Sequence, residues 1–120
     1  MIRRLIPLFL CLALLTSCDD ESKAKKTAKQ FLKENLAETS FNIKEVSRLD
    51  STFVITDSIV EIMRQNTSSQ PQFTGKKIQW SKRDGSKLRY ARIIYKVYDK
   101  EFTQTFYFDD KLEKVIAVKN

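Results

Sequence analysis

The stretch LRYARIIYKVYDKEFTQTFYF, residues 88–108, decides the expected fold. Apolar side chains alternate with mixed ones in its first half, and this period of two is typical of a half-buried β-strand. The side chains expected to face the core there are Ala91, Ile93, Tyr95 and Val97. Asp99-Lys100 turns the chain, and a return strand follows, marked by Phe102, Phe106 and Phe108. The stretch therefore predicts two antiparallel strands joined by a tight turn.

Two more strands are expected to extend this hairpin into a meander. Ile78 and Trp80 alternate with polar residues over 77–81, and Asp84-Gly85 is a strong hairpin signal before residue 88. After Asp109-Asp110 a closing strand is expected, with one parity shared by Leu112, Ile116 and Val118. An antiparallel sheet of about four strands results, and we expect it to lay one face on the helices.

Two helices are expected upstream of the meander. After Ser22, the expected N-cap, apolar residues recur at helical spacing to about residue 37, and lysines fill the other face. The expected inward set is Ala24, Ala28, Phe31, Leu32 and Leu36. Thr56-Asp57 is a capping pair that predicts a second, short helix, and residues 67–72 are expected to form a loop. The inward set of this helix is expected to be Ile59, Ile62 and Met63.

Between the helices, residues 41–53 predict a strand with a bulge near 45–47, because one extra residue would switch its inward parity. Its inward set is expected to be Phe41, Ile43, Val46 and Leu49.

The N-terminal segment has the pattern of an export signal. Arg3 and Arg4 precede an almost unbroken apolar run over residues 5–15. The run is shorter than the roughly 20 apolar residues that cross a bilayer, and acidic residues follow it at once. The four residues at its end closely resemble a bacterial lipobox: Leu15, Thr16, Ser17 and Cys18.

This resemblance implies that a signal peptidase recognises residues 15–17, that residues 1–17 are removed, and that the Cys18 thiol carries a diacylglycerol. Residues 18–22 would then tether a single domain, residues 23–120, to a membrane. An ordinary secretory signal with a chance cysteine is the alternative. The acidic cluster of Asp19, Asp20 and Glu21 resembles a surface-export signal, which implies the cell envelope at the outer membrane, periplasmic or surface-exposed. An inner-membrane retention signal and a solvated linker are the other interpretations.

Composition narrows the chemistry. The chain has 120 residues, two Cys, no His and a formal net charge of +7. Cys11 would leave with the signal and Cys18 would carry lipid, so no intrachain disulfide is expected. Without His or a free thiol, the usual zinc and copper ligands and the Ser-His and Cys-His nucleophile pairs are missing. We therefore expect no enzyme activity, no metal site and no cofactor.

The second face of the 88–98 strand is half aromatic or aliphatic and half basic, and it is the expected partner-binding face. Its candidate residues are Tyr90, Arg92, Lys96 and Tyr98. Basic residues interleaved with rings over 76–96 also suit single-stranded nucleic acid. An exported protein seldom meets nucleic acid, so the expected partner is an acidic protein, glycan or lipid headgroup. A merely solvated face is the alternative.

The order of helix, strand, short helix and meander resembles the NTF2-like and cystatin-like α+β folds, in which a curved sheet wraps an N-terminal helix. The segment AKQFLKENL, residues 28–36, also resembles the start of small bacterial lipoproteins. Enzymes of the NTF2-like superfamily place an Asp or Tyr in the cone between sheet and helix. Asp50 and Asp57 match by residue type alone, and capping of a turn or helix is their expected role.

Two three-residue patterns, Asp50-Ser51-Thr52 and Asp57-Ser58-Ile59, resemble a bacterial O-glycosylation signal and imply candidate glycan sites at Ser51 and Ser58. The expected function is a lipid-anchored envelope protein whose small domain binds or scaffolds. One alternative is a small-ligand carrier of the NTF2-like kind, which needs a hollow cone. Another is a periplasmic inhibitor or immunity protein.

Overall fold

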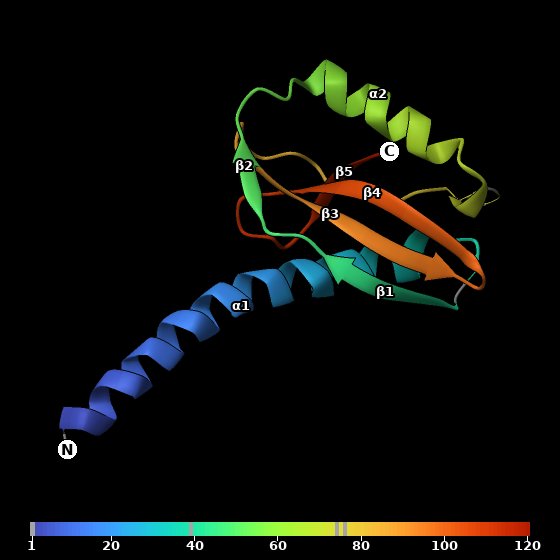
Figure 1. Ribbon diagram of the computed structural model, residues 1–120. Helices are drawn as coiled ribbons and strands as arrows, with labels where there is room; N and C mark the ends of the chain where they lie inside the picture. Colours follow the sequence, from blue (N-terminus) through green and yellow to red (C-terminus); the bar gives the residue numbers. More distant parts are fainter. Residues whose placement is uncertain (1, 39, 74, 76) are drawn as a thin grey trace.

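Two helices lie on opposite faces of an antiparallel sheet. The structure, a computed structural model, describes residues 2–38, 40–73, 75 and 77–120, with side chains from Asp19 onward. Helix α1, Ile2–Asn35, packs on one face of the sheet, and helix α2, Asp57–Ser68, packs on the other (Figure 1). The predicted α+β class is confirmed. The expectation that both helices share one face is wrong, because both faces of the sheet carry apolar side chains.

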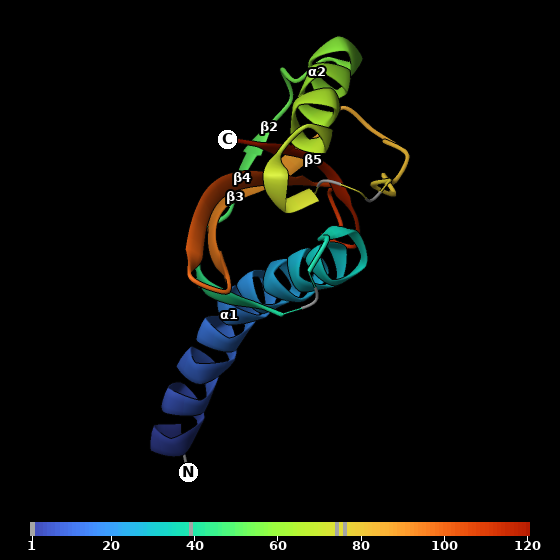
Figure 2. The ribbon, with the colours of Figure 1, turned by 90° about the vertical axis from the view of Figure 1, so that its right-hand side faces the viewer.

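The described residues form five strands in one open sheet: β1 (Phe41–Val46), β2 (Asp50–Thr52), β3 (Leu88–Val97), β4 (Lys100–Phe108) and β5 (Val115–Lys119). The order is β1-β3-β4-β5, and β2 also pairs with β3. The predicted β3–β4 hairpin is confirmed, but its turn is Tyr98-Asp99, one residue before the predicted Asp99-Lys100, and it closes at the pair Val97–Lys100. The sheet curves around α1 (Figure 2).

The inner core lies between α1 and the sheet. All five residues of the predicted inward set of α1 are buried, and so are Ala91, Ile93 and Tyr95 of β3. Phe31 makes edge-on contacts with Phe73 and Phe106, at centroid distances of 6.3 and 6.0 Å. One prediction fails at the helix start. Ser22 lies inside α1 instead of capping it, because α1 begins at Ile2.

The edge of the sheet is split into β1 and β2. A bulge between Ile43 and Glu45 shifts the register, close to the predicted place. Ser47 explains the break after β1: its N–H donates to the Arg92 carbonyl (2.9 Å), and its Oγ accepts from the Arg92 N–H (2.8 Å). The Ser47 hydroxyl thus takes the place of a backbone carbonyl as the acceptor between the two strands. The predicted inward set is confirmed, since Ile43 is buried and Phe41, Val46 and Leu49 pack against the inner core.

Helix α2 begins as predicted and then departs from expectation. Thr56 is the N-cap, and its side chain accepts from the Ile59 N–H at 3.3 Å. The buried residues are Val60, Met63 and Thr67. Ile59 and Ile62 are 40% and 57% exposed, so the predicted inward face is wrong apart from Met63. The expected loop 67–72 is also wrong in part, because α2 runs to Ser68 and a short 3-10 helix follows at Pro71–Phe73.

Two strand predictions are wrong near the C-terminal half. Residues 77–82 form no strand, and Asp84-Gly85 bends the chain without joining two strands. Leu112 occupies a turn with a φ of 60°, before β5 begins. A second bulge between β4 and β5 leaves Ile116 unpaired and packed on the α2 side, whereas Val118 faces the inner core. The predicted shared parity therefore does not hold.

Candidate functional site

Part of the sheet face that carries α2 remains uncovered. Helix α2 places Val60 and Met63 in a cluster with Leu88, Tyr107, Ile116 and Ala117, against which Tyr90 also packs. On the remainder of that face, Arg92, Thr105 and Lys119 lie side by side across three strands, and Ile94 lies opposite Thr103. We call it the open outer face, and it consists of Arg92, Ile94, Lys96, Glu101, Thr103, Thr105 and Lys119.

The open outer face carries excess positive charge. Lys44 of β1 pairs with Glu101 of β4 at 3.2 Å, with both side chains about half exposed. Within the described part of the chain no ion pair involves the three cations of this face, Arg92, Lys96 and Lys119. The acidic residues there are Glu101, which lies opposite Lys96 and pairs with Lys44, and Glu45, which lies opposite Ile94 at the margin. A surface with excess positive charge attracts anions. The threonines beside the cations have short side chains, so an anion can come close to those cations.

The four residues predicted to bind a partner do not form one patch. Arg92 and Lys96 lie on the open outer face, and Tyr90 borders it with its ring 5.5 Å from that of Tyr107. Tyr98 sits in the β3–β4 turn with a φ of 54°, and its hydroxyl donates to Glu38 Oε2 at 3.2 Å. That hydrogen bond raises the pKa of Tyr98. The strand alternation that grouped Tyr98 with the others ends at Val97.

The sequence interpretation missed Thr103, Thr105 and Lys119. Thr103 and Thr105 could have been found from the sequence, because they alternate with Phe102 and Phe106 and so belong to the opposite face of the strand. Lys119 needs the register of β5 on β4, which a bulge shifts.

A buried amide network closes one end of the inner core. The Tyr95 hydroxyl donates to Gln104 Oε1 at 2.5 Å and accepts from Gln72 Nε2 at 3.2 Å. Gln104 Nε2 in turn donates to Gln70 Oε1 and to Asn120 Oδ1, at 2.6 and 2.8 Å. Burial raises the pKa of Tyr95, only partly offset by the Gln72 hydrogen bond. The hydroxyl is therefore a structural donor and not an acid near neutral pH.

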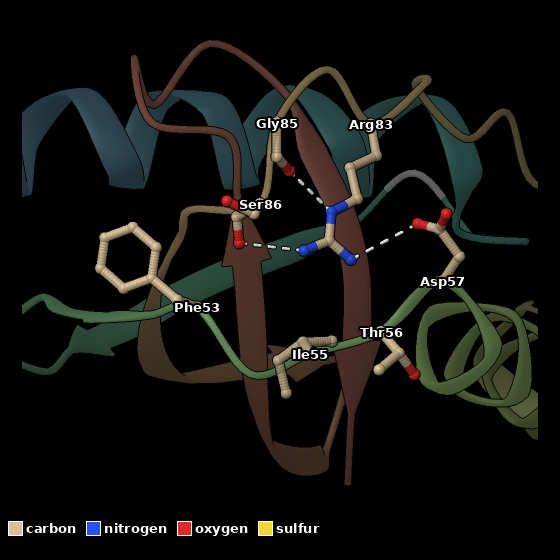
Figure 3. A pocket seen from close by; sticks show the side chains of 7 residues that line it. All are labelled: Phe53, Ile55, Thr56, Asp57, Arg83, Gly85 and Ser86. Atoms are coloured by element: carbon tan, nitrogen blue, oxygen red, sulfur yellow. Dashed lines mark hydrogen bonds and ion pairs between the residues drawn. The ribbon is translucent and has the colours of Figure 1, made fainter.

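A surface hollow of about 420 Å³ lies between the β2–α2 loop and residues 83–86 (Figure 3). Arg83 donates from Nε to the Gly85 carbonyl (2.7 Å) and from Nη2 to the Ser86 carbonyl (3.0 Å). Its Nη1 lies 3.5 Å from Asp57 Oδ1, a carboxylate that is 94% exposed. Arg83 thus holds the loop together, and an exposed ion pair of this kind contributes little.

The remaining candidate side chains are at the surface. Asp50 and Ser51 are exposed in β2, and Asp57 and Ser58 are exposed in the first turn of α2. Asp57 is placed favourably for an acidic residue, since the N-terminus of a helix carries partial positive charge. Both serines are accessible to a modifying enzyme.

The acidic cluster after Cys18 is partly tied to the domain. Asp20 Oδ2 lies 3.6 Å from Arg89 Nη2 at the start of β3, while Asp19 and Glu21 are exposed. The backbone of residues 18–22 belongs to α1. The side chains of Leu15, Thr16, Ser17 and Cys18 lie outside the part of the chain that the structure describes.

Among the described residues, no helix combines the length and apolar character needed to span a bilayer. In the same part of the chain, His, Cys, Asp and Glu form no group of three or more that could hold a metal ion.

No protein-family model, curated protein or solved structure gives a significant match to this chain. Function is therefore argued from the surfaces just described.

Proposed function

We propose that this chain is a lipid-anchored protein of the bacterial cell envelope whose domain binds an acidic partner through the open outer face. The observation that carries the proposal is a sheet face with three cations that form no ion pair in the described residues, although Glu101 lies opposite Lys96. A cluster of cations that exceeds the neighbouring acids attracts an anionic surface, and the short threonine side chains beside these cations allow such a surface to come close.

The residues of this face are chemically suited to binding and not to catalysis. Arginine presents a planar fork of donors that matches carboxylate or phosphate, and lysine adds a point charge. Threonine hydroxyls at Thr103 and Thr105 can donate to the same anion. The carboxylates of this face are those of Glu101, opposite Lys96, and of Glu45 at its margin, opposite Ile94.

We propose further that the fold is of the NTF2-like or cystatin-like kind. The curvature of the sheet around α1 supports this assignment (Figure 2). The NTF2-like carrier alternative has less support, because rings fill the space between helix and sheet. Tyr95 stacks 5.4 Å from Phe102 and contacts Phe106 edge-on at 6.3 Å. These rings occupy the volume that a small ligand would need.

The anchor is proposed at Cys18, with cleavage after Ser17, and the outer membrane is the proposed location. Two or three acyl chains would hold the protein firmly, since each buried methylene contributes about 0.8 kcal/mol. The ion pair between Asp20 and Arg89 would keep the domain close to the lipid. Arg89 is consequently expected to lie at the membrane-proximal end of the sheet.

A charge-reversal experiment tests the binding proposal. The variant Arg92→Glu with Lys96→Glu should abolish recovery of partners that are cross-linked on intact cells. The matched control is Lys25→Glu with Lys29→Glu, which reverses two exposed lysines of α1 instead. Equal recovery by the wild type and the first variant, or equal loss in both variants, would contradict a specific role of the open outer face.

A further inference from the structure

Residues 77–82 have the side-chain pattern of a strand but not the backbone partners of one. Among the described residues no backbone–backbone hydrogen bond involves this segment. Ile78 is buried and Trp80 packs against the inner core, while Lys77, Gln79 and Lys82 are exposed. We call residues 77–82 the lone segment. Over residues 77–80 burial alternates as it does along an extended backbone, and beyond them Ser81 is half-buried and Lys82 exposed.

Side chains already occupy one side of the lone segment. The Gln79 N–H donates to Asn35 Oδ1 at 2.8 Å, and the Ser81 carbonyl accepts from Arg64 Nη2 at 2.7 Å. Arg64 Nε also donates to the Ile116 carbonyl of β5 at 2.9 Å. Arg64 therefore bridges the lone segment and β5, in the place where strand-to-strand hydrogen bonds would otherwise run.

The opposite side of the lone segment is open. Neighbouring residues of an extended chain direct their backbone groups to opposite sides. Because Gln79 and Ser81 point toward Asn35 and Arg64, the N–H and carbonyl groups of Ile78, Trp80 and Lys82 point away. Within the described residues these groups have no hydrogen-bond partner. A row of unpaired amides and carbonyls is a template for another strand.

Two hollows flank the lone segment next to the helices. One, of about 370 Å³, lies on the α2 side and is lined by Ile78, Trp80, Arg64 and Glu61. The other, of about 530 Å³, lies on the α1 side, and its lining includes Gln79, Ser81, Lys26 and Glu113. Successive side chains of an added strand would point toward α2 and α1 in turn.

We propose that the lone segment is a docking edge to which an extended, acidic peptide of another protein adds as a strand. Its ends carry Lys77 and Lys82, both exposed and without ion pairs in the described part of the chain. On the α1 side Lys26 and Lys114 are balanced by Glu34 and Glu113, so the excess positive charge is that of Lys77 and Lys82. Backbone complementarity selects an extended chain, and these lysines select acidic side chains.

A second copy of this chain is disfavoured by the same charges. Antiparallel self-pairing of residues 77–82 would set Lys77 opposite Lys82 at both ends, and like charges directly opposite are destabilising. The lone segment is separate from the open outer face and from the lipid anchor, so its test does not depend on either.

The test uses the full chain in detergent micelles and the peptide Glu-Val-Glu-Val-Glu-Val-Glu, with amide hydrogen exchange followed by NMR. Binding should slow exchange at least tenfold at the amides of Ile78, Trp80 and Lys82. Gln79, already bonded to Asn35, should change little. The matched control peptide has the same sequence with methyl groups on alternate backbone nitrogens, which keeps the charge and blocks strand pairing, and it should give no protection.

Variants separate this site from the open outer face. Lys77→Glu with Lys82→Glu should weaken peptide binding about tenfold, because two exposed charge contacts become repulsive. Arg92→Glu with Lys96→Glu should leave it unchanged. No binding up to millimolar peptide, equal binding of the methylated peptide, or protection confined to β1 would overturn the proposal. Protection that rises with protein concentration alone would assign the edge to a second copy and overturn it as well.

Discussion

Replacing Arg64 by Met should destabilise the protein more than any other change of a surface cation. The substitution keeps the aliphatic length of the side chain but removes the guanidinium, which donates to the Ile116 and Ser81 carbonyls at 2.9 and 2.7 Å. It also removes the cation–π contact of Arg64 Cζ, 5.4 Å from the centroid of Trp80. Burial removes part of the Arg64 guanidinium from water and so lowers its pKa.

The size of the effect follows from these contacts. A hydrogen bond from a charged donor contributes about 1.5–3 kcal/mol, and a cation–π contact contributes about 0.5–1 kcal/mol at an exposed site. Water can reach part of this half-exposed site, so we take the lower end of each range. Arg64→Met should then lower the free energy of unfolding by about 3–4 kcal/mol. Arg64→Lys should lose about half of that, because an ammonium cannot reproduce the planar fork.

The assay is urea unfolding followed by the fluorescence of Trp80, the only tryptophan of the chain, and by circular dichroism. Arg92→Met is the matched control, since Arg92 is an exposed cation without an ion pair in the described residues, and it should change stability by less than about 0.5 kcal/mol. A loss below about 1 kcal/mol for Arg64→Met, or equal losses for the two variants, would refute a bridging role for Arg64.

Three further changes test other parts of the fold. Tyr98→Asn should raise stability by about 0.5–1 kcal/mol in the same urea assay, because a φ of 54° strains a bulky residue and suits Asn; an unchanged or lower midpoint would argue against strain. Leu32→Ala should lower stability by about 2–5 kcal/mol, since Leu32 is fully buried; a loss below 1 kcal/mol would show that the inner core is loosely packed. Burial raises the pKa of Tyr95, so the folded chain keeps a proton that the unfolded chain releases above its ordinary pKa of about 10. Stability is therefore complete below about pH 10 and should fall above it by up to about 1.4 kcal/mol per pH unit. Tyr95→Phe should reduce that slope, and an unchanged slope would assign it to other groups such as Tyr107, whose pKa burial also raises.

The β3–β4 hairpin could be predicted because its two strands follow each other in the sequence and form their backbone hydrogen bonds with each other. Alternation gave the inward face, whereas the turn lies at Tyr98-Asp99, one residue before the predicted position. The amphipathic part of α1 was predictable for a similar reason, since Ala24, Ala28 and Leu32 form one stripe whatever surface covers them. In both cases the periodicity of one short stretch contains the whole signal.

The lone segment could not be predicted, because a strand pattern does not say whether a partner is present. Ile78 and Trp80 are oriented as expected, but Arg64 occupies the place of the ladder hydrogen bonds. Arg64 lies on α2, and the sequence pattern predicts Ile59 and Ile62 on the inward face of that helix, which is wrong. Those residues are outward because Val60 and Thr67 meet β5 instead, a contact that depends on the tertiary arrangement.

The open outer face was half predicted. Alternation within β3 placed Arg92 and Lys96 together, whereas Lys119 joins them through the register of β5 on β4. Tyr98 was grouped with them in error, because a turn ends the alternation at Val97.

The proposal as a whole depends most on the fate of Cys18. Mass spectrometry of the N-terminal peptide of protein recovered from cell membranes tests it directly. If Cys18 is the lipid anchor, the recovered chain begins at Cys18 and carries the added mass of a diacylglycerol, with or without an acyl group on the new amine. A chain that retains residues 1–17, or an unmodified Cys18, would contradict it.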